Sequence, residues 1–228
     1  MQWELPGTED LQIFYEFLAI DLNSLESQST FTSLIFLCIR SNGTGQVVIF
    51  VKCHSELLKV QMVISGDNFA SQFGYALTTA DVNSDGFADL FVAAPFYHDK
   101  HSGGGVYYYR NTDQGLDTVS EPVLLTGASE SRFGFALSSA GDVNSDGFED
   151  LVVGAPYEGR GAVYLYQGSS QGLRTKPSQV IHAEDVPGAP LNTFGYSLSG
   201  GLDMDLNNHS DVLVGAYQRY QPIKFYIV

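Results

Sequence analysis

The chain has 228 residues, 44% of them hydrophobic, and a formal net charge of −15 at pH 7. This length and apolar fraction are typical of a folded chain with one large or two small domains. The negative charge argues against nucleic acid as a partner, because phosphate binding needs a basic surface, and it favours bound cations or a positively charged partner. The 24 glycines, 13 tyrosines and 15 phenylalanines indicate many short strands joined by tight turns.

Residues 1–44 form the first segment, and they match nothing later in the chain. Within them, the stretch DLQIFYEFLAIDL at residues 10–22 is compatible with an amphipathic helix. The acidic start lacks the basic region of a secretory signal, and the apolar stretch at residues 31–39 is too short to cross a bilayer. We therefore expect either a cytoplasmic protein or a partial chain that lacks its true start, with residues 1–44 outside the native repeat array.

Two cysteines, Cys38 and Cys53, flank a turn at residues 41–45. They fit either one disulfide across that turn or two unpaired thiols. The turn also carries Asn42 in an Asn-Gly-Thr tripeptide, which fits the acceptor pattern for N-glycosylation of a secreted glycoprotein, and a second such tripeptide begins at Asn208.

From residue 66 onward the chain is repetitive, and residues 45–66 resemble the second half of one repeat. Each unit contains a Phe-Gly segment, an acidic nonapeptide, an apolar segment and an aromatic segment, in that order. The Phe-Gly segments are FGYAL (73–77), FGFAL (133–137) and FGYSL (194–198), and the nonapeptides begin 61 residues apart, at Asp81, Asp142 and Asp203. The units cover about residues 67–127, 128–187 and 188–228, within a repeat domain at residues 45–228.

Each unit has room for four short strands, because segments such as LVVGAP and GAVYLY are β-branched or aromatic and are bounded by glycine or proline. A four-stranded sheet of this size cannot bury both faces alone, so neighbouring units must stack, and the small Gly-Ala-Pro residues let their backbones approach closely. Radial stacking gives a β-propeller. The sequence therefore predicts an all-β fold: a partial β-propeller with about three four-stranded blades and part of a preceding blade.

The nonapeptides DVNSDGFAD and DVNSDGFED have an acidic or amide side chain at positions 1, 3, 5 and 9. A tight loop brings such alternate oxygens to one point, and Ca²⁺ takes about six to eight oxygen ligands. Gly86 and Gly147, at position 6, permit the positive φ that turns the chain, so that position 7 offers its backbone carbonyl. An EF-hand is excluded, because its twelfth position must be glutamate and here it is Val92 or Val153.

The third nonapeptide, DMDLNNHSD, has Asn208 in place of the glycine, and asparagine is the other residue that best tolerates positive φ. Because three copies occur in register, we expect up to three Ca²⁺ ions in loops that join two strands, although metal-free Asx turns would use the same residues. The predicted ligands are Asp81, Asn83, Asp85, Phe87 and Asp89 in the first copy, Asp142, Asn144, Asp146, Phe148 and Asp150 in the second, and Asp203, Asp205, Asn207, His209 and Asp211 in the third.

These motifs together resemble the FG-GAP repeat of integrin α-subunit propellers, over about residues 66–228. The stretches that carry the resemblance are residues 133–173 and 194–217, while residues 179–201 are similar to the laminin-binding type of α chain. The resemblance implies a seven-bladed extracellular propeller with calcium loops in its last three or four blades. Seven units of about 60 residues need about 400 residues or more, so the chain resembles part of such a propeller.

The resemblance also implies a role without enzymatic activity, in cell adhesion to matrix and in integrin-mediated signalling. The implied partners are an integrin β subunit and an extracellular matrix protein, with laminin as the candidate. The implied location is the extracellular side of the plasma membrane, within a single-pass receptor, where this segment itself contacts neither the membrane nor nucleic acid.

Two other classes of protein stay open from the sequence. A phospholipase D that cleaves glycosylphosphatidylinositol-anchored proteins also carries FG-GAP repeats, beside a separate catalytic domain rich in zinc ligands. Here His98 and His101 have an H-x-x-H spacing, but they lie in a polar linker, which favours a pair of surface side chains over a zinc site. The third class is an intracellular or bacterial structural propeller. In any of these, the strand at residues 106–110 should place Tyr107 and Tyr109 on one face, packed between sheets.

Overall fold

The structure is a computed structural model that describes residues 17–18, 33–38, 43–51, 59–187, 191–218 and 221–227. Within these ranges the fold is all-β, with one 3₁₀ turn at Ala183–Asp185 and no α-helix. The predicted all-β class, a partial β-propeller, is confirmed. Asn42 and Cys53 lie outside the described residues, and with them the predicted glycosylation and the disulfide alternative.

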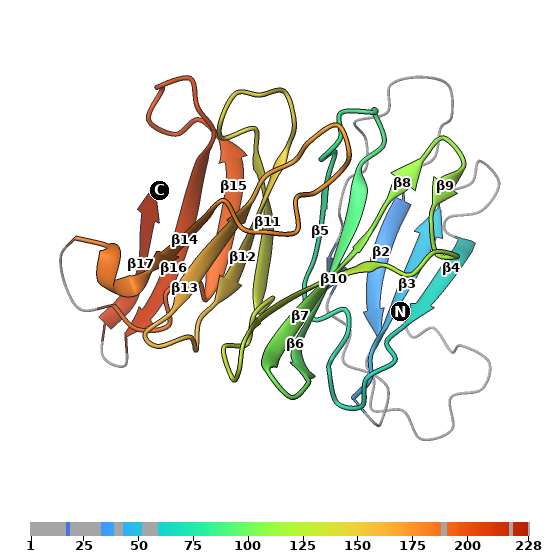
Figure 1. Cartoon of the computed structure of the whole chain (residues 1–228), viewed down its shortest axis with the longest axis horizontal. Helices are drawn as coiled ribbons and strands as arrows, with labels where there is room; N and C mark the ends of the chain where they lie inside the picture. Colours follow the sequence, from blue (N-terminus) through green and yellow to red (C-terminus); the bar gives the residue numbers. More distant parts are fainter. Residues whose placement is uncertain are drawn as a thin grey trace.

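Four antiparallel sheets follow one another in chain order across the molecule (Figure 1). The first sheet contains β1 (Phe17–Leu18), β2 (Ser33–Cys38), β3 (Gln46–Val51) and β4 (Lys59–Ser65). The second contains β5 (Leu77–Ala80), β6 (Asp89–His98), β7 (Ser102–Tyr109) and β10 (Val123–Ala128). The third contains β11 (Ala136–Gly141), β12 (Asp150–Ala155), β13 (Ala162–Tyr166) and β14 (Gln179–His182), and the fourth contains β15 (Ser197–Leu202), β16 (Asp211–Gln218) and β17 (Gln221–Ile227). A short hairpin, β8 (Asn111–Thr112) and β9 (Gly115–Leu116), follows the second sheet's third strand.

The first sheet takes two of its strands from the segment that matches no repeat. Phe17 and Leu18 pair with Ile35 and Phe36 in an antiparallel arrangement, so the helix expected at residues 10–22 is wrong for these two residues. β2 in turn pairs with β3 along six positions. Cross-strand pairing to an existing sheet satisfies the backbone groups of a short apolar stretch, and this outweighs the helical periodicity of the sequence. The boundary proposed at residue 44 stays a prediction.

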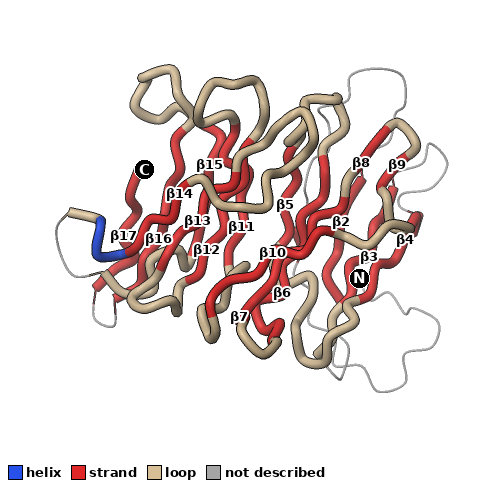
Figure 2. The backbone as a smooth tube through the Cα atoms, viewed as in Figure 1, coloured by secondary structure: helices blue, strands red, loops and turns tan. Residues whose placement is uncertain are grey.

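The second strand of each of the first two repeats is buried on both faces, because a neighbouring sheet covers each side. All six residues of β12 are buried, as are the first seven of β6. This burial explains the continuous apolar runs LVVGA and LFVAAP, which lack the alternation of a half-exposed strand. The outer strand β10 is mostly exposed instead, and Leu125 is its one buried residue. In Figure 2 the strands of consecutive sheets stand face to face, and β11 lies between β5 and β15.

Each interface between sheets contains the phenylalanine of a Phe-Gly pair. Phe73, Phe133 and Phe194 are each 0–1% exposed and belong to three separate hydrophobic clusters. Phe73 makes edge-to-face contacts with Tyr107 and Tyr109, at centroid distances of 5.1 and 6.5 Å. The prediction that these two tyrosines share one face and pack between sheets is therefore confirmed.

The Phe-Gly backbone also joins each sheet to the one before it. The amides of the three phenylalanines donate hydrogen bonds of 3.0 to 3.3 Å to carbonyls just before, or at the start of, a strand of the preceding sheet. At each contact the next residue of that segment is a glycine that lies against the phenylalanine backbone. A Cβ on these glycines would lie 2.1 to 2.3 Å from that backbone; they are Gly45, Gly104 and Gly161. Only glycine allows this approach, since all three also have positive φ.

We predict that Phe133→Ala lowers the free energy of unfolding by about 3–5 kcal/mol, because it removes a fully buried ring from the interface between the second and third sheets. Urea denaturation in calcium-containing buffer measures this change. The matched control is Phe69→Ala, since Phe69 is 79% exposed and its removal should change stability by about 0.5 kcal/mol or less. Equal losses in both variants would contradict the role assigned to the Phe-Gly ring.

Candidate metal centres

The three nonapeptides form three equivalent loops at one edge of the molecule, the upper edge in Figure 1. Each loop joins the first strand of a repeat to the second: β5 to β6, β11 to β12, and β15 to β16, all antiparallel pairs. The prediction that the loops are connections between two strands is confirmed. Neighbouring loops also touch. The Ser84 hydroxyl donates a hydrogen bond to the Gly147 carbonyl, and the Ser145 hydroxyl lies 3.4 Å from Nδ1 of His209.

The first aspartate of each loop folds the chain around its own carboxylate. Asp81 accepts hydrogen bonds from the amides of Asp85 and Gly86, at 3.1 and 2.9 Å. Asp142 and Asp203 accept the equivalent pair of bonds, at 3.0 and 2.7 Å and at 3.0 and 2.8 Å. The side-chain oxygen at position 3 accepts a bond from the amide at position 5 in every copy, at 3.3, 3.0 and 3.1 Å. The sequence pattern thus produces one loop geometry three times.

The predicted positive φ at position 6 is confirmed, with values of 87° at Gly86, 90° at Gly147 and 68° at Asn208. A Cβ at either glycine would meet nothing within 4 Å, so backbone conformation alone requires the glycine. Position 4 also has a positive φ in all three loops, at Ser84, Ser145 and Leu206. Sequence reasoning missed this second left-handed residue, because serine and leucine carry no signal for it.

The ninth residue is a buried carboxylate that ties the loop to the sheet. Asp89 and Asp150 are 0% exposed and Asp211 is 5% exposed. Asp89 accepts hydrogen bonds from the Asn111 amide at 2.7 Å and from the Tyr108 hydroxyl at 3.0 Å. Asp150 likewise accepts from two amides, those of Gly168 at 2.9 Å and Val143 at 3.2 Å. In these two copies, both oxygens of the residue expected to close a calcium cage already hold protein donors.

Burial disfavours the ionised form of the ninth carboxylate. A bound cation would stabilise that ionised form. The pKa of Asp89 is raised to about 6: desolvation is the main cause, the hydrogen bonds from Asn111 and Tyr108 lower the pKa, and the charges of Asp85 and Asp81 raise it. Burial also raises the pKa of Asp150, and the nearby Asp146 and Asp142 act in the same direction. A donor set of several carboxylates and amide oxygens in a tight loop fits a hard divalent cation.

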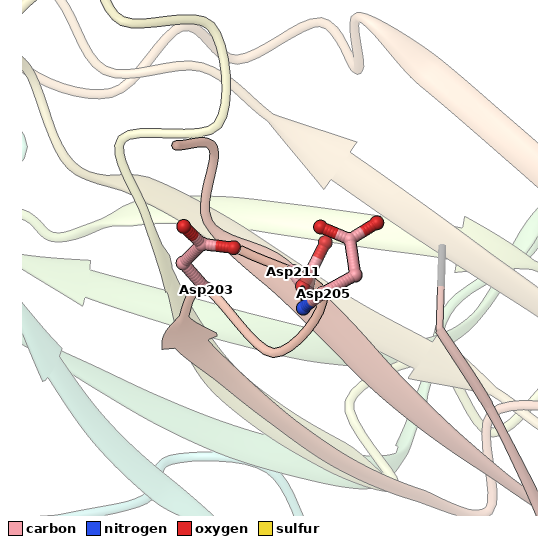
Figure 3. A group of neighbouring side chains, drawn as sticks. All are labelled: Asp203, Asp205 and Asp211. Carbon is pink, nitrogen blue, oxygen red and sulfur yellow. Dashed lines mark hydrogen bonds between the residues drawn. The ribbon is translucent and has the colours of Figure 1, made fainter. Parts of the chain in front are cut away.

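The third loop brings its carboxylates closest together. One oxygen each from Asp203, Asp205 and Asp211 lie within 4.8 Å of one another, and Figure 3 shows them around a single bend of the chain. No other group of three potential His, Cys, Asp or Glu ligands that close occurs in the described ranges. The third loop differs because it has aspartate at position 3, where the other copies have Asn83 and Asn144. Those two amides instead donate to the carboxylates at position 5, at 2.8 and 3.0 Å.

The remaining residues that the sequence singled out, at position 7 of the loops and in the H-x-x-H pair, differ in their exposure to solvent. Phe87 and Phe148 are half-buried, and His209 is exposed, so only their backbone carbonyls stay as predicted ligands at position 7. His98 and His101 are both exposed and belong to no close group of metal-binding side chains among the described residues. The described part of the chain also contains no helix with the length and apolar character needed to span a membrane.

We predict that Asp150→Ala and Asp146→Ala separate fold stability from ion binding. With chelator present, Asp150→Ala should lower the free energy of unfolding by about 1–3 kcal/mol, because it leaves the Gly168 and Val143 amides without their acceptor. Asp146 is exposed, so its replacement should cost about 0.5–1 kcal/mol under the same conditions. Chemical denaturation with and without calcium measures both. The idea of a structural ninth residue fails if the two variants lose equal stability in chelator.

Comparison with known proteins places the chain in a family. The model for the FG-GAP repeat matches residues 73–109 and 133–166. Integrin alpha-7 of Rattus norvegicus is 47% identical over 179 residues, which are 78% of this chain and 15% of the relative. Integrin alpha-3 of Cricetulus griseus is 38% identical over 218 residues, or 94% of this chain and 21% of the relative. Integrin alpha-6 of Gallus gallus is 41% identical over 180 residues, or 78% and 16%. The chain thus spans about a fifth or less of these relatives, and in its FG-GAP repeats and propeller sheets it belongs to the integrin α-subunit family.

Proposed function

We propose that this chain is a calcium-binding propeller segment of an extracellular adhesion receptor. The observation that carries the proposal is the threefold recurrence of one loop geometry, in which carboxylate and amide oxygens gather at the start of a buried strand. Oxygen-only donors in a flexible loop suit Ca²⁺ better than Mg²⁺, which demands a more regular octahedron. Three such ions would move the formal charge from −15 to about −9 and relieve repulsion within each loop.

The ions would act on stability rather than on chemistry. Each loop connects the first strand of a repeat, which is an edge strand (β5, β11 or β15), to the second strand, and consecutive loops touch. A bound cation would therefore help to fix these edge strands of neighbouring sheets relative to one another. No catalytic role is needed, and family membership favours an adhesion-receptor segment over the phospholipase alternative, whose zinc ligands have no counterpart close together in the described chain.

In the complete receptor, the partners we propose are an integrin β subunit and an extracellular matrix protein. The matches to alpha-7, alpha-3 and alpha-6 chains support the laminin-binding type suggested by residues 179–201. The proposed location is the outer side of the plasma membrane, within a single-pass receptor whose membrane contact lies outside the described residues.

Calcium titration tests the proposed metal sites. Isothermal calorimetry should find about three ions per chain, and calcium at 100 times its dissociation constant should add about 2.7 kcal/mol per site to the free energy of unfolding. Asp146→Ala should lower the stoichiometry by one, because Asp146 supplies a carboxylate to the second loop alone. A melting temperature that is the same with calcium and with chelator would refute the metal sites. A phosphodiesterase assay on lipid-anchored substrate should show no activity.

A chimera tests the receptor role separately. Residues 66–218 would replace the matching segment of rat integrin alpha-7, and flow cytometry would measure the heterodimer at the cell surface with a β subunit. We expect surface expression comparable to that of the parent chain, because the replaced segment keeps the same sheets and loops. The control carries Asp85→Ala, Asp146→Ala and Asp205→Ala together and should reach the surface several-fold less. A chimera that folds but never pairs with the β subunit would argue against this role.

A further inference from the structure

The third nonapeptide exposes apolar side chains that the first one lacks. Leu206, at position 4, is 83% exposed, and Met204, at position 2, is 40% exposed. In the first loop the same positions hold the polar Ser84 and Val82, which is 0% exposed. Two apolar side chains of the third loop thus face solvent where the first loop has a hydroxyl group and a buried valine.

The same loop carries the tripeptide Asn208-His209-Ser210, which fits the N-x-S/T acceptor pattern for an N-linked glycan. The other two loops have Gly86 and Gly147 in place of the asparagine. The loop itself requires only a positive φ at this position, and glycine adopts that conformation at no steric cost. Calcium binding therefore gives no reason for the asparagine side chain or for the hydroxyl group two residues later.

The third loop uses the backbone of Asn208 and leaves its side chain unengaged. The Asn208 amide donates a hydrogen bond of 2.8 Å to Oδ2 of Asp203. Its side chain is exposed and makes no hydrogen bond to any residue that the structure describes. Nδ2 of Asn208 is therefore free to carry a substituent without the loss of an interaction that the loop needs.

The equivalent glycines show that a side chain at position 6 leaves the loop into open space. A Cβ built at Gly86 or at Gly147 meets nothing within 4 Å, and the third loop repeats the geometry of the other two. Even the carboxylate of Asp81, which accepts the Gly86 amide, is farther than 4 Å from that Cβ. A substituent on the side chain at position 6 therefore extends away from the aspartate that begins the predicted ligand set.

The exposed leucine lies within reach of a sugar on the asparagine. Leu206 is two residues before Asn208, and two residues of chain span at most about 7 Å. The first sugar of an N-linked glycan has an apolar C–H face, which can lie against an exposed aliphatic side chain. The acceptor tripeptide and the exposed apolar side chain therefore occur together in the one loop that differs from its two copies.

We propose that Asn208 is the attachment site of an N-linked glycan, whose first sugar covers Leu206. The inference rests on the proposed extracellular location, because only a chain in the secretory pathway meets the glycan donor, a lipid-pyrophosphate-linked oligosaccharide. In the transfer, Nδ2 of Asn208 forms a bond to C1 of the first N-acetylglucosamine and loses one proton. The bond from C1 to the pyrophosphate oxygen breaks, and the lipid pyrophosphate leaves.

Peptide mapping tests the attachment site. The full chain, with a cleavable secretory signal before residue 1, would be expressed in mammalian cells and treated with peptide N-glycosidase, which converts a glycosylated asparagine to aspartate. Mass spectrometry should find this conversion at Asn208 in most of the folded chains, defined as those that resist limited proteolysis in calcium. Ser210→Thr should keep the glycan, and Ser210→Ala should lose it. An unmodified Asn208 in folded chains, or a glycan found only in protease-sensitive chains, would overturn the proposal.

Asn208→Gly is the matched control, because it removes the acceptor and restores the glycine of the other two loops. It should bind the same number of calcium ions as the glycosylated chain. Calcium titration of both proteins also separates this inference from the proposed function. A glycosylated chain that binds no calcium would refute the metal sites alone, and an unmodified chain that binds calcium would refute the glycan alone.

Binding of a hydrophobic dye tests the contact with Leu206. Asn208→Gly, which lacks the glycan, should bind more dye than the glycosylated wild-type chain, because Leu206 is uncovered. In a Leu206→Ser background, which restores the serine of the other two loops, the same comparison should show a smaller difference. Equal differences in the two backgrounds would contradict the proposed cover.

Discussion

The stacking of the sheets depends on one contact, in which the backbone of a Phe-Gly pair lies directly against a glycine of the preceding sheet. The contact recurs at Phe73, Phe133 and Phe194, and a single methyl group on the facing glycine would overlap it. The phenylalanine ring then fills the apolar space that the close approach creates. Backbone hydrogen bonds and ring burial thus reinforce each other at every interface. Because the sheets are stacked in this way, the three nonapeptide loops lie next to one another at one edge.

The ninth residue of the nonapeptide stands at the end of an exposed loop, but its carboxylate is buried in the interior of the molecule. In the third sheet, the carboxylate of Asp150 accepts hydrogen bonds both from the nonapeptide, at Val143, and from the segment after β13, at Gly168. Burial disfavours its charged form, and the charges of the neighbouring carboxylates act in the same direction. The ninth residue is therefore part of the fold as well as a ligand of the proposed cation site.

The sequence predicted the repeats, the two-strand setting of the loops and the positive φ at Gly86, Gly147 and Asn208, because periodicity and glycine chemistry are local properties. It could not predict that Phe17 and Leu18 form a strand, since that outcome depends on a partner about 18 residues away. The sequence analysis singled out the third loop only for Asn208 in place of glycine, whereas the structure shows that Asp205 gives that loop the closest carboxylates. The hydrogen bonds of Asp89 to Asn111 and Tyr108 follow from tertiary packing, which spacing alone does not reveal.

The direction of the Phe-Gly contact has a consequence for synthesis on the ribosome. Each phenylalanine binds to a sheet made of residues that precede it, so Phe133 meets Gly104 and Phe194 meets Gly161. The receiving surface of every repeat is thus translated before the repeat that uses it. A nascent chain can add one sheet at a time to an edge that already exists, and the order of emergence matches the order of assembly.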